Sequence, residues 1–241
     1  MTERADKLLY IKGLAKSRSA AQTLIEEGKV YCNRRLVLKP SEPLDNNCEL
    51  TVTEKQKYVS RGGYKLEYAL DRFGIDVNGD VCADIGASTG GFTDCLLQRG
   101  ASKVYAIDVG HGQLDASLAS DRRVISIEGL NARDINPDSI GELCDTVVMD
   151  VSFISQTYIH EKVSAVLKSG GKFISLIKPQ FEAGREFIGK HGIADSSSYD
   201  TVIGKVKKSA SDHGLECVNT DKSVIKGGDG NTEFIAYFRK K

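Results

Sequence analysis

The sequence lacks any long apolar run and any closely spaced pair of cysteines, and each absence excludes a class of protein. No stretch approaches the roughly 18 apolar residues of a membrane span, and no apolar signal core follows the charged N-terminal residues. The six cysteines include no Cys-x-x-Cys pair, so neither a zinc cluster nor a thioredoxin-like redox site is expected. We therefore expect a cytoplasmic protein with no membrane segment, no metal site and buried free thiols.

The sequence also lacks a net charge, but this balance hides an asymmetry. The chain has 33 Lys/Arg and 33 Asp/Glu residues, yet residues 1–65 carry 13 basic and only 8 acidic side chains. A basic N-terminal part favours a polyanionic partner, although an excess of this size is also common on a solvated surface. A chain of 241 residues, 40% of them apolar, is expected to fold as a small module followed by one domain of ordinary size.

The N-terminal part begins with the pattern of two short helices. Apolar residues at helical spacing between Leu8 and Leu14 predict the first helix. Ser19, followed three residues later by Gln22, has the pattern of a capping box and predicts the start of the second helix. Gly28 suits the left-handed residue that ends a helix.

Two strands and a linker complete the predicted α+β module. Residues 29–35 and 49–52 alternate between apolar and polar side chains, as short strands do. The polar residues 53–57 lack an apolar period, so we expect the domain boundary there, in a linker region at 53–60. We therefore expect a module at residues 1–57 and a second domain at residues 58–241.

This module resembles an S4 RNA-binding domain in the segments from Arg4 to Leu9 and from Gly13 to Val30. The resemblance implies binding to structured RNA, and the basic side chains near the turn between the helices and on the first strand agree with it. A charged surface that only confers solubility is the alternative. The residues expected to bind RNA are Arg4, Lys12, Lys16, Arg18, Lys29, Arg34, Arg35 and Arg61.

A glycine-rich loop follows the first apolar strand of the second domain, residues 81–85. Its spacing, Gly-x-x-x-Gly-Gly, does not meet the Gly-x-Gly-x-x-Gly fingerprint, which counts against NAD and FAD. The next strand, 103–108, ends in Asp108, a carboxylate that can hold both hydroxyls of an adenosine ribose. Asp84, the loop and Asp108 together resemble the methyltransferases that use S-adenosylmethionine (SAM).

This resemblance implies a SAM site at the ends of these strands. Glycines let the backbone approach a ligand closely, and Asp84 would help to hold the positively charged amino-acid part of SAM. A third strand is expected at 122–127, and either Asn131 or Asp134 beyond it would reach the adenine. The residues expected to bind the cofactor are Asp84, Gly86, Ser88, Gly90, Gly91, Phe92, Asp108, Asn131, Asp134 and Asp150.

Two further predicted strands end in charged residues. Residues 146–150 end in Asp150, and Lys178 follows the strand at 172–177. We expect both side chains at the sheet edge where open α/β folds bind their ligands, with a helix over residues 157–167 between them. A last strand, 231–238, contains Glu233 and follows a glycine-rich turn at 227–230.

Lys65 is the remaining unusual charge, because a helix dipole disfavours a cation in the first turn of a helix. Each of these charges alone has the alternative of being an ordinary surface group. Together, Lys65, Asp150, Lys178 and Glu233 match in order and context the Lys-Asp-Lys-Glu tetrad of the FtsJ-like RNA 2'-O-methyltransferases. We therefore expect these four residues to be catalytic.

The whole chain, S4 module included, resembles the TlyA family, which is often labelled as hemolysins but is implicated in 2'-O-methylation of cytidines in ribosomal RNA. Its strongest local matches are the segments 60–66, 84–94, 150–155 and 177–182. The resemblance implies ribosomal RNA or ribosomal subunits as partners and SAM as the cofactor. It also implies a Rossmann-like α/β fold with a seven-stranded, mostly parallel sheet and an antiparallel last strand.

Other activities on the same fold lack their characteristic residues. A cytosine-C5 methyltransferase usually presents its thiolate as Pro-Cys, and no proline here precedes a cysteine. An exocyclic-amine methyltransferase typically carries Asn/Asp-Pro-Pro-Tyr/Phe, where this chain has Asp150-Val151-Ser152-Phe153. Two alternatives from other classes are an RNA-binding protein without catalysis and a pore-forming hemolysin, and the sequence contains no membrane-inserting stretch for the second. The sequence leaves open whether Lys178 acts as a base or as an electrostatic stabiliser.

Overall fold

The computed structural model describes residues 2–53, 57–227 and 230–241. The chain divides into two compact units, Met1–Arg61 and Gly62–Lys241. Three residues of the predicted linker region, 54–56, lie outside the described residues, and so do two residues of the predicted glycine-rich turn, 228–229.

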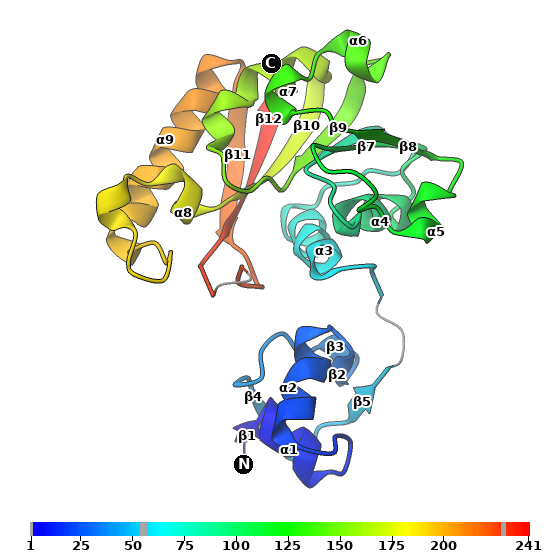
Figure 1. Ribbon diagram of the computed structural model, residues 1–241, viewed down its shortest axis with the longest axis vertical. Coiled ribbons are helices and arrows are strands. Elements are labelled where there is room, and N and C mark those ends of the chain that lie inside the picture. The colour runs from blue at the N-terminus through cyan, green and yellow to red at the C-terminus, as the bar shows by residue number, and fades with distance from the viewer. Residues whose placement is uncertain (1, 54–56, 228–229) are drawn as a thin grey trace. The chain divides into compact units, whose positions relative to one another are not determined.

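Two short helices belong to the first unit, α1 at Ala5–Ile11 and α2 at Arg18–Glu26 (Figure 1). The predicted capping box at Ser19 is wrong, because the hydroxyl of Ser17 accepts the capping hydrogen bond, at 3.1 Å, from a backbone N–H three residues later. Ser17 has the extended backbone that an N-cap needs, whereas Ser19 lies inside the first turn. The predicted left-handed residue after the helix is confirmed at Gly28, with φ of 70°.

Short strands surround these helices. They are β1 (Thr2–Arg4), β2 (Val30–Cys32), β3 (Arg35–Leu36), β4 (Pro43–Asp45) and β5 (Leu50–Val52). Strand β1 pairs with β4, and β2 lies between β3 and β5 in an antiparallel sheet. The single strand predicted at 29–35 is therefore two strands, because Asn33 and Arg34 turn the chain with positive φ. Apolar side chains of both helices and of β2 form one core.

The second unit is built on a seven-stranded sheet in the order β11-β12-β10-β9-β6-β7-β8 (Figure 1). The strands are β6 (Val81–Ile85), β7 (Lys103–Asp108), β8 (Val124–Glu128), β9 (Cys144–Met149), β10 (Leu167–Ile177), β11 (Leu215–Lys222) and β12 (Phe234–Lys240). Neighbouring strands from β10 to β8 are parallel, and β12 is antiparallel to both of its neighbours. The predicted fold class, with its antiparallel last strand, is confirmed.

Helices cover both faces of this sheet. They are α3 (Arg61–Phe73), α4 (Gly91–Gln98), α5 (Ala116–Ala119), α6 (Pro137–Ile140), α7 (His160–Val166), α8 (Pro179–Glu182) and α9 (Tyr199–Asp212). Side chains alternate across a strand, so Ala83 and Ile85 of β6 join the core formed with α7 and α9. Asp84 between them faces the opposite layer, where it contacts Thr93 of α4. The same sheet therefore has an apolar core on one face and a charged residue buried under the other.

Three predicted elements differ at their ends. The helix predicted at 157–167 is a 3₁₀ turn, Gln156–Tyr158, followed by α7 from His160. Strand β9 ends at Met149 and strand β12 starts at Phe234, one and three residues away from the predicted bounds. Asp150 and Glu233 therefore lie just outside their strands, where the alternation of a strand does not set the direction of a side chain.

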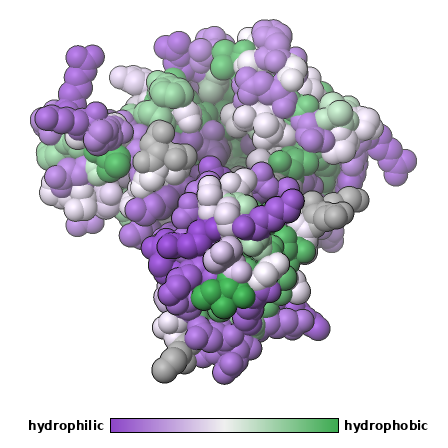
Figure 2. All heavy atoms as spheres, turned by 60° about the horizontal axis from the view of Figure 1, so that its bottom comes forward, coloured by the Kyte–Doolittle hydropathy of each residue, from purple (hydrophilic) through white to green (hydrophobic). Residues whose placement is uncertain are grey.

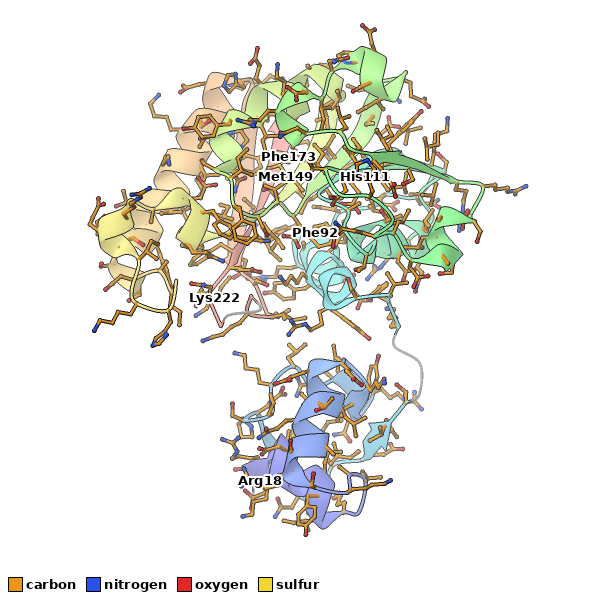
Figure 3. All side chains as sticks on the ribbon, in the orientation of Figure 1. Arg18, Phe92, His111, Met149, Phe173 and Lys222 are labelled. Atoms are coloured by element: carbon orange, nitrogen blue, oxygen red, sulfur yellow. The ribbon has the colours of Figure 1, made fainter. Side chains whose placement is uncertain are left out.

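The interior of the second unit is apolar, and Figure 3 shows Met149 and Phe173 within it; both are fully buried. The face shown in Figure 2 is mainly hydrophilic, with scattered apolar patches. In the described ranges, no helix is both long and apolar enough to cross a membrane. Those ranges also contain no group of three or more His, Cys, Asp or Glu side chains arranged to hold a metal ion.

Candidate active site

A cavity of about 610 Å³ lies at the edge of the sheet where β6, β7 and β9 end. It is lined by residues at the ends of these strands and in the segments that follow them and β8, including Gly86, Ser88, Asp108, Asn131, Asp150 and Phe153. Because the three strands are parallel neighbours, their C-terminal residues come to one edge. The predicted cofactor residues thus divide into those that line this cavity and those that do not.

Asp84, at the end of β6, is a fully buried carboxylate with an incomplete set of partners. Its Oδ2 accepts hydrogen bonds from the Thr93 backbone N–H at 2.9 Å and from the Thr93 hydroxyl at 2.7 Å, whereas no described residue donates to Oδ1. Burial raises the pKa of Asp84 to about 7, against the effect of the Thr93 hydrogen bonds, and the charges of Asp150 and Asp108 raise it further. A bound cation would relieve this unfavourable charge.

Asp108, at the end of β7, is held in place by hydrogen bonds from two backbone N–H groups. Its Oδ2 accepts a hydrogen bond from the Ser88 N–H at 2.8 Å, and its Oδ1 accepts one from the Gly110 N–H at 2.7 Å. Each carboxylate oxygen has a second lone pair, so two acceptor positions remain for a ligand. Asp108 lines the cavity and can accept hydrogen bonds from a pair of adjacent hydroxyls.

The glycines of the loop after β6 have different surroundings. Gly86 has φ of 83°, and a Cβ on it would lie 2.7 Å from the Asp150 carbonyl oxygen, so this position requires glycine. Gly90, the N-cap of α4, packs instead against the side chains of Leu114 and Leu118. Of the predicted loop residues, Gly86 and Ser88 line the cavity, whereas Gly90, Gly91 and Phe92 are not among its lining residues. Phe92 lies in the first turn of α4 and is buried (Figure 3).

The two residues considered for the adenine also differ. Asn131 lines the cavity, and its side-chain oxygen accepts a hydrogen bond from the Arg133 backbone N–H at 3.0 Å. Asp134 is the last residue of the 3₁₀ turn that follows Asn131, Ala132–Asp134. It is exposed and is not among the residues that line the cavity. The geometry favours Asn131 as the ligand contact.

The four residues of the expected tetrad meet at this same edge of the sheet as two ion pairs. Lys178 Nζ lies 2.6 Å from Asp150 Oδ1 and donates a hydrogen bond to the Ser152 hydroxyl at 2.8 Å. Lys65 Nζ lies 2.6 Å from Glu233 Oε2, and both side chains are buried.

Sheet register explains how these pairs become neighbours. In the antiparallel pairing of β10 with β12, Ile177 is opposite Phe234, so Lys178 and Glu233 follow at the same end of the ladder. In the parallel pairing of β9 with β10, Met149 is opposite Ser175, which brings Asp150 to that end as well. Lys65 approaches from α3. Each of the two lysines is thus held by a carboxylate at this end of the sheet, and Asp150 is the tetrad residue that lines the cavity.

The sequence did not mark an aromatic pair next to the tetrad. Phe153 lines the cavity, is 91% exposed and has a positive φ of 63°, and its ring centroid lies 5.0 Å from that of Phe181. A bulky residue with a left-handed backbone and a solvent-facing ring is unusual in a protein without a ligand for it. The motif Asp150-Val-Ser-Phe contains this aromatic, but a sequence does not distinguish an exposed phenylalanine from a buried one.

Several of the basic residues expected to bind RNA already have partners within the first unit. Arg4 and Arg18 each lie 3.0 Å from Oδ2 of Asp6, which is fully buried and also accepts a hydrogen bond from Gln22. The hydrogen bond from Arg4 is the main reason why the pKa of Asp6 lies well below its ordinary value. Arg18, labelled in Figure 3, is about half exposed, so its guanidinium still faces solvent.

The other basic residues vary in the same way. Arg35 pairs with Glu42 and Lys29 with Glu27, and Lys12 donates to the Cys48 carbonyl at 2.8 Å. The remaining three expected residues are exposed: Lys16, Arg34 and Arg61. Lys16 lines an open hollow of about 640 Å³ beside α2.

Comparison with known families agrees with this division of the chain. An S4 domain model matches residues 3–47, and a model of the FtsJ-like methyltransferases matches residues 58–240. The second match covers most of the chain, so the unit with the tetrad is an FtsJ-like methyltransferase domain. The first match identifies the N-terminal unit as an S4 domain.

Relatives match this chain across both domains. The chain is 39% identical over 239 residues to the 16S/23S rRNA (cytidine-2'-O)-methyltransferase TlyA of Mycobacterium tuberculosis, covering 98% of this chain and 89% of that protein. The chain belongs to the TlyA family. Another relative, Hemolysin A of Brachyspira hyodysenteriae, is 44% identical over 237 residues, covering 98% and 99% of the two chains. The resemblance to TlyA proteins inferred from the motifs is therefore confirmed.

A solved structure has the same arrangement of elements as this TlyA-family chain. A Streptococcus thermophilus protein that carries a hemolysin name superimposes with a TM-score of 0.76 at 44% identity, covering all of this chain and 89% of that one. The family thus contains both hemolysin names and methyltransferase names, and the geometry of the site has to decide between the activities that they suggest.

Proposed function

We propose that this chain methylates a ribose 2'-hydroxyl of ribosomal RNA with SAM as the methyl donor, and that the acceptor is a cytidine. The observation that carries the proposal is the pair of lysines fixed at the same edge of the sheet as the cavity, Lys178 by Asp150 and Lys65 by Glu233. The relative from Mycobacterium tuberculosis is named for this reaction on both ribosomal RNAs, which supports the choice of acceptor.

The cavity fits SAM in its charges and its hydrogen-bonding groups. Asp108 lines the cavity and has free acceptor positions for the ribose hydroxyls. Asp84 is fully buried and does not line the cavity, so its unpaired oxygen would favour the ammonium of the amino-acid part from beneath the loop. Asn131 would contact the adenine, and the glycine at 86 lets the backbone approach the ligand. When bound, SAM supplies an electrophilic methyl group on a positively charged sulfur.

The tetrad residues act on the acceptor. A ribose hydroxyl is a very weak acid, so a site that methylates it must stabilise negative charge on its oxygen. Lys178 is placed to do so, with Asp150 and Ser152 fixing the direction of its side chain. Lys65, held by Glu233, would position the hydroxyl for in-line attack.

The exposed aromatic pair gives the acceptor base a place to stack. Single-stranded RNA is recognised largely by stacking of unpaired bases on aromatic rings, a contact worth roughly 1–3 kcal/mol per base. Phe153 presents such a ring at the mouth of the cavity, and Phe181 supports it from the side. The S4 domain would hold the RNA further along its backbone, and a ribosomal substrate places the protein in the cytoplasm.

The test is to incubate the chain with tritiated SAM and separated ribosomal subunits, and to map the product by mass spectrometry. We expect label on the ribose of one or more cytidines, and none with the Lys178→Ala variant over the same time. Methylation of a base would overturn the choice of ribose. The absence of transfer to either subunit, with RNA binding intact, would favour an RNA-binding protein without catalysis.

A further inference from the structure

Two segments carry the catalytic and substrate-facing groups of the site. One follows β9 and runs from Asp150 to Gln156, and the other follows β10 and runs from Lys178 to Glu182. Both leave the sheet at the same edge, and neither is part of a strand. Their alignment decides where Lys178 points relative to Asp150.

Three successive contacts join these two segments. The first is the Lys178 ammonium with Asp150 and Ser152, and the second is the Phe181 ring with the Phe153 ring. The ring pair lies at the open side of the site, where Phe153 is almost fully exposed. The Lys178 and Asp150 side chains are only 11% and 21% exposed, so their ion pair is partly shielded from water.

The third contact lies in the interior. Glu182 is 5% exposed, and its Oε2 accepts a hydrogen bond from the Ser155 hydroxyl at 2.5 Å while its Oε1 accepts one from the Gln156 backbone N–H at 2.7 Å. Both oxygens of one carboxylate on the second segment thus hold two consecutive residues of the first. Hydrogen bonds to a buried charged group are short and directional, so this contact fixes distance and angle together.

Further hydrogen bonds connect Gln156 to the sheet. The Gln156 side-chain oxygen accepts a hydrogen bond from the buried Ser175 hydroxyl at 2.6 Å, and its amide nitrogen donates to the Leu176 carbonyl at 3.4 Å. Ser175 and Leu176 belong to β10, the strand that ends just before Lys178. The end of the first segment is therefore held by hydrogen bonds to β10, the strand that immediately precedes Lys178.

A buried carboxylate is an unfavourable choice for stability alone. Burial raises the pKa of Glu182, and its two hydrogen bonds only partly oppose this effect. The nearest cation is Lys205 of α9, 3.9 Å from Oε2 and about half exposed, so the charge is incompletely compensated. An apolar side chain would fill the same space at lower cost, which indicates that the position is used for alignment.

We propose that Glu182 is a positioning residue for methyl transfer, which fixes the segment of Asp150 and Phe153 against the segment of Lys178 and Phe181. This inference rests on the proposed function for its effect on turnover, but the tether itself is independent of the reaction. Glu182 touches neither ligand nor acceptor and acts through the groups that do.

Three substitutions at Glu182 distinguish the contribution of its side-chain length from that of its charge. Glu182→Ala removes both hydrogen bonds, and we expect turnover to fall by about tenfold to a hundredfold, since small misplacements of reacting groups have effects of this order. Glu182→Gln keeps the length and both contacts, because its oxygen can accept from the Gln156 N–H and its nitrogen can donate to the Ser155 hydroxyl. We expect it to retain most of the turnover. Glu182→Asp keeps the charge but is one methylene shorter, and we expect it to behave like the alanine variant.

A matched control is Glu142→Ala. Glu142 also accepts two hydrogen bonds, from the Lys103 ammonium and the Tyr105 hydroxyl, both at 2.7 Å. Lys103 and Tyr105 lie in the first half of β7, whereas the site lies at the other end of this strand. Loss of turnover in this control equal to that of Glu182→Ala would indicate a general effect on folding and would overturn the proposal.

Two readouts show whether Glu182 acts by alignment. In a double-mutant cycle, Glu182→Ala should have a much smaller effect on turnover when Lys178 is already alanine, because the aligned group is absent; additive losses would contradict the proposal. Hydrogen exchange should become faster at residues 151–156 in Glu182→Ala and stay at the wild-type rate in Glu182→Gln. Unchanged exchange in the alanine variant would refute the tether. If the wild type transferred no methyl group, the proposed function would fail, whereas the exchange data would still decide the tether.

Discussion

Within the described ranges, each unit contains one fully buried aspartate, and the two have opposite electrostatic surroundings. Asp6 in the S4 domain accepts hydrogen bonds from the guanidinium groups of Arg4 and Arg18 and from Gln22, and its pKa lies well below the ordinary value. Asp84 in the methyltransferase domain has only Thr93 as a donor, and burial raises its pKa to about 7. The two side chains are equally inaccessible to solvent, but Asp84 lies deeper in its domain and has fewer donors, so the two pKa shifts are opposite.

The difference shows how each domain uses charge. In the S4 domain the buried charge is fully satisfied inside the fold, so its role is structural and two expected RNA-binding arginines take part in it. At the strand ends of the methyltransferase domain, charge is left without a complete set of partners, which is typical of ligand sites. Four predictions test this comparison.

The largest effect is expected at Lys178, whose charge serves the reaction. Lys178→Ala should reduce turnover by a factor of roughly 10²–10³, as expected when one preorganised stabiliser of transition-state charge is lost, while SAM affinity and stability change little. Single-turnover methyl transfer measures the loss, and thermal unfolding checks the fold. Lys178→Arg keeps the cation but is not a base, so substantial residual activity would favour electrostatic stabilisation.

Asp6→Asn should destabilise the S4 domain by about 2 kcal/mol, because hydrogen bonds between charged groups are lost while both arginines remain half exposed and can be hydrated again. Native-state hydrogen exchange over α1 and α2 measures the change, with Glu26→Gln on the exposed side of α2 as the control. Because the pKa of Asp6 is lowered by folding, its contribution is present above the ordinary aspartate pKa and is lost as the pH falls below about 4. Unchanged exchange would remove the contrast between the two aspartates.

Asp84 should make SAM binding depend on pH. A cation bound beside the carboxylate favours its ionised form, so below a pKa of about 7 binding must release a proton. SAM affinity should therefore rise by up to about tenfold per pH unit between pH 6 and 7 and level off above. Calorimetry over this range tests it, and Asp84→Asn should bind more weakly with the dependence removed. The same slope in the asparagine variant would assign the proton to another group.

The smallest effect separates two neighbouring basic residues of the S4 domain. Lys16→Ala should lower the salt dependence of RNA binding by one phosphate contact, a change of roughly 0.7–0.9 in the log–log slope, without a change in stability. Arg18→Ala should change both RNA binding and stability, because Arg18 also holds Asp6. A salt titration and hydrogen exchange on both variants test the difference. Equal stabilities would show that the arginine contact with Asp6 is unimportant for the fold.

The position of the site could be predicted from the sequence because apolar runs that end in a charged residue are simple to recognise. Asp84, Asp108, Asp150 and Lys178 all follow such runs, and parallel strands bring their ends to one edge. Strand β11 was not placed, because it is an edge strand with one fully buried residue, Leu215, and so has no apolar pattern.

Contacts between distant segments could not be predicted from the sequence. Lys65 and Glu233 are 168 residues apart, and only the resemblance to the FtsJ-like enzymes paired them with the other two residues. Glu182 follows a predicted strand end, but nothing local shows that it binds Ser155, 27 residues earlier. Ser17 and Ser19 are both suitable N-caps by residue type, and only the structure shows that Ser17 takes this position.

The place of β12 in the sheet sets the order in which this protein can become an enzyme during its synthesis. This strand is made after β10 and β11, yet it lies between them, and it brings Glu233 to Lys65. A nascent chain that lacks it therefore has a complete S4 domain, a β10 edge without its neighbour and a lysine without its carboxylate. Such a chain has its S4 domain before its four-residue tetrad is complete, and its β10 edge is open to pairing with another strand.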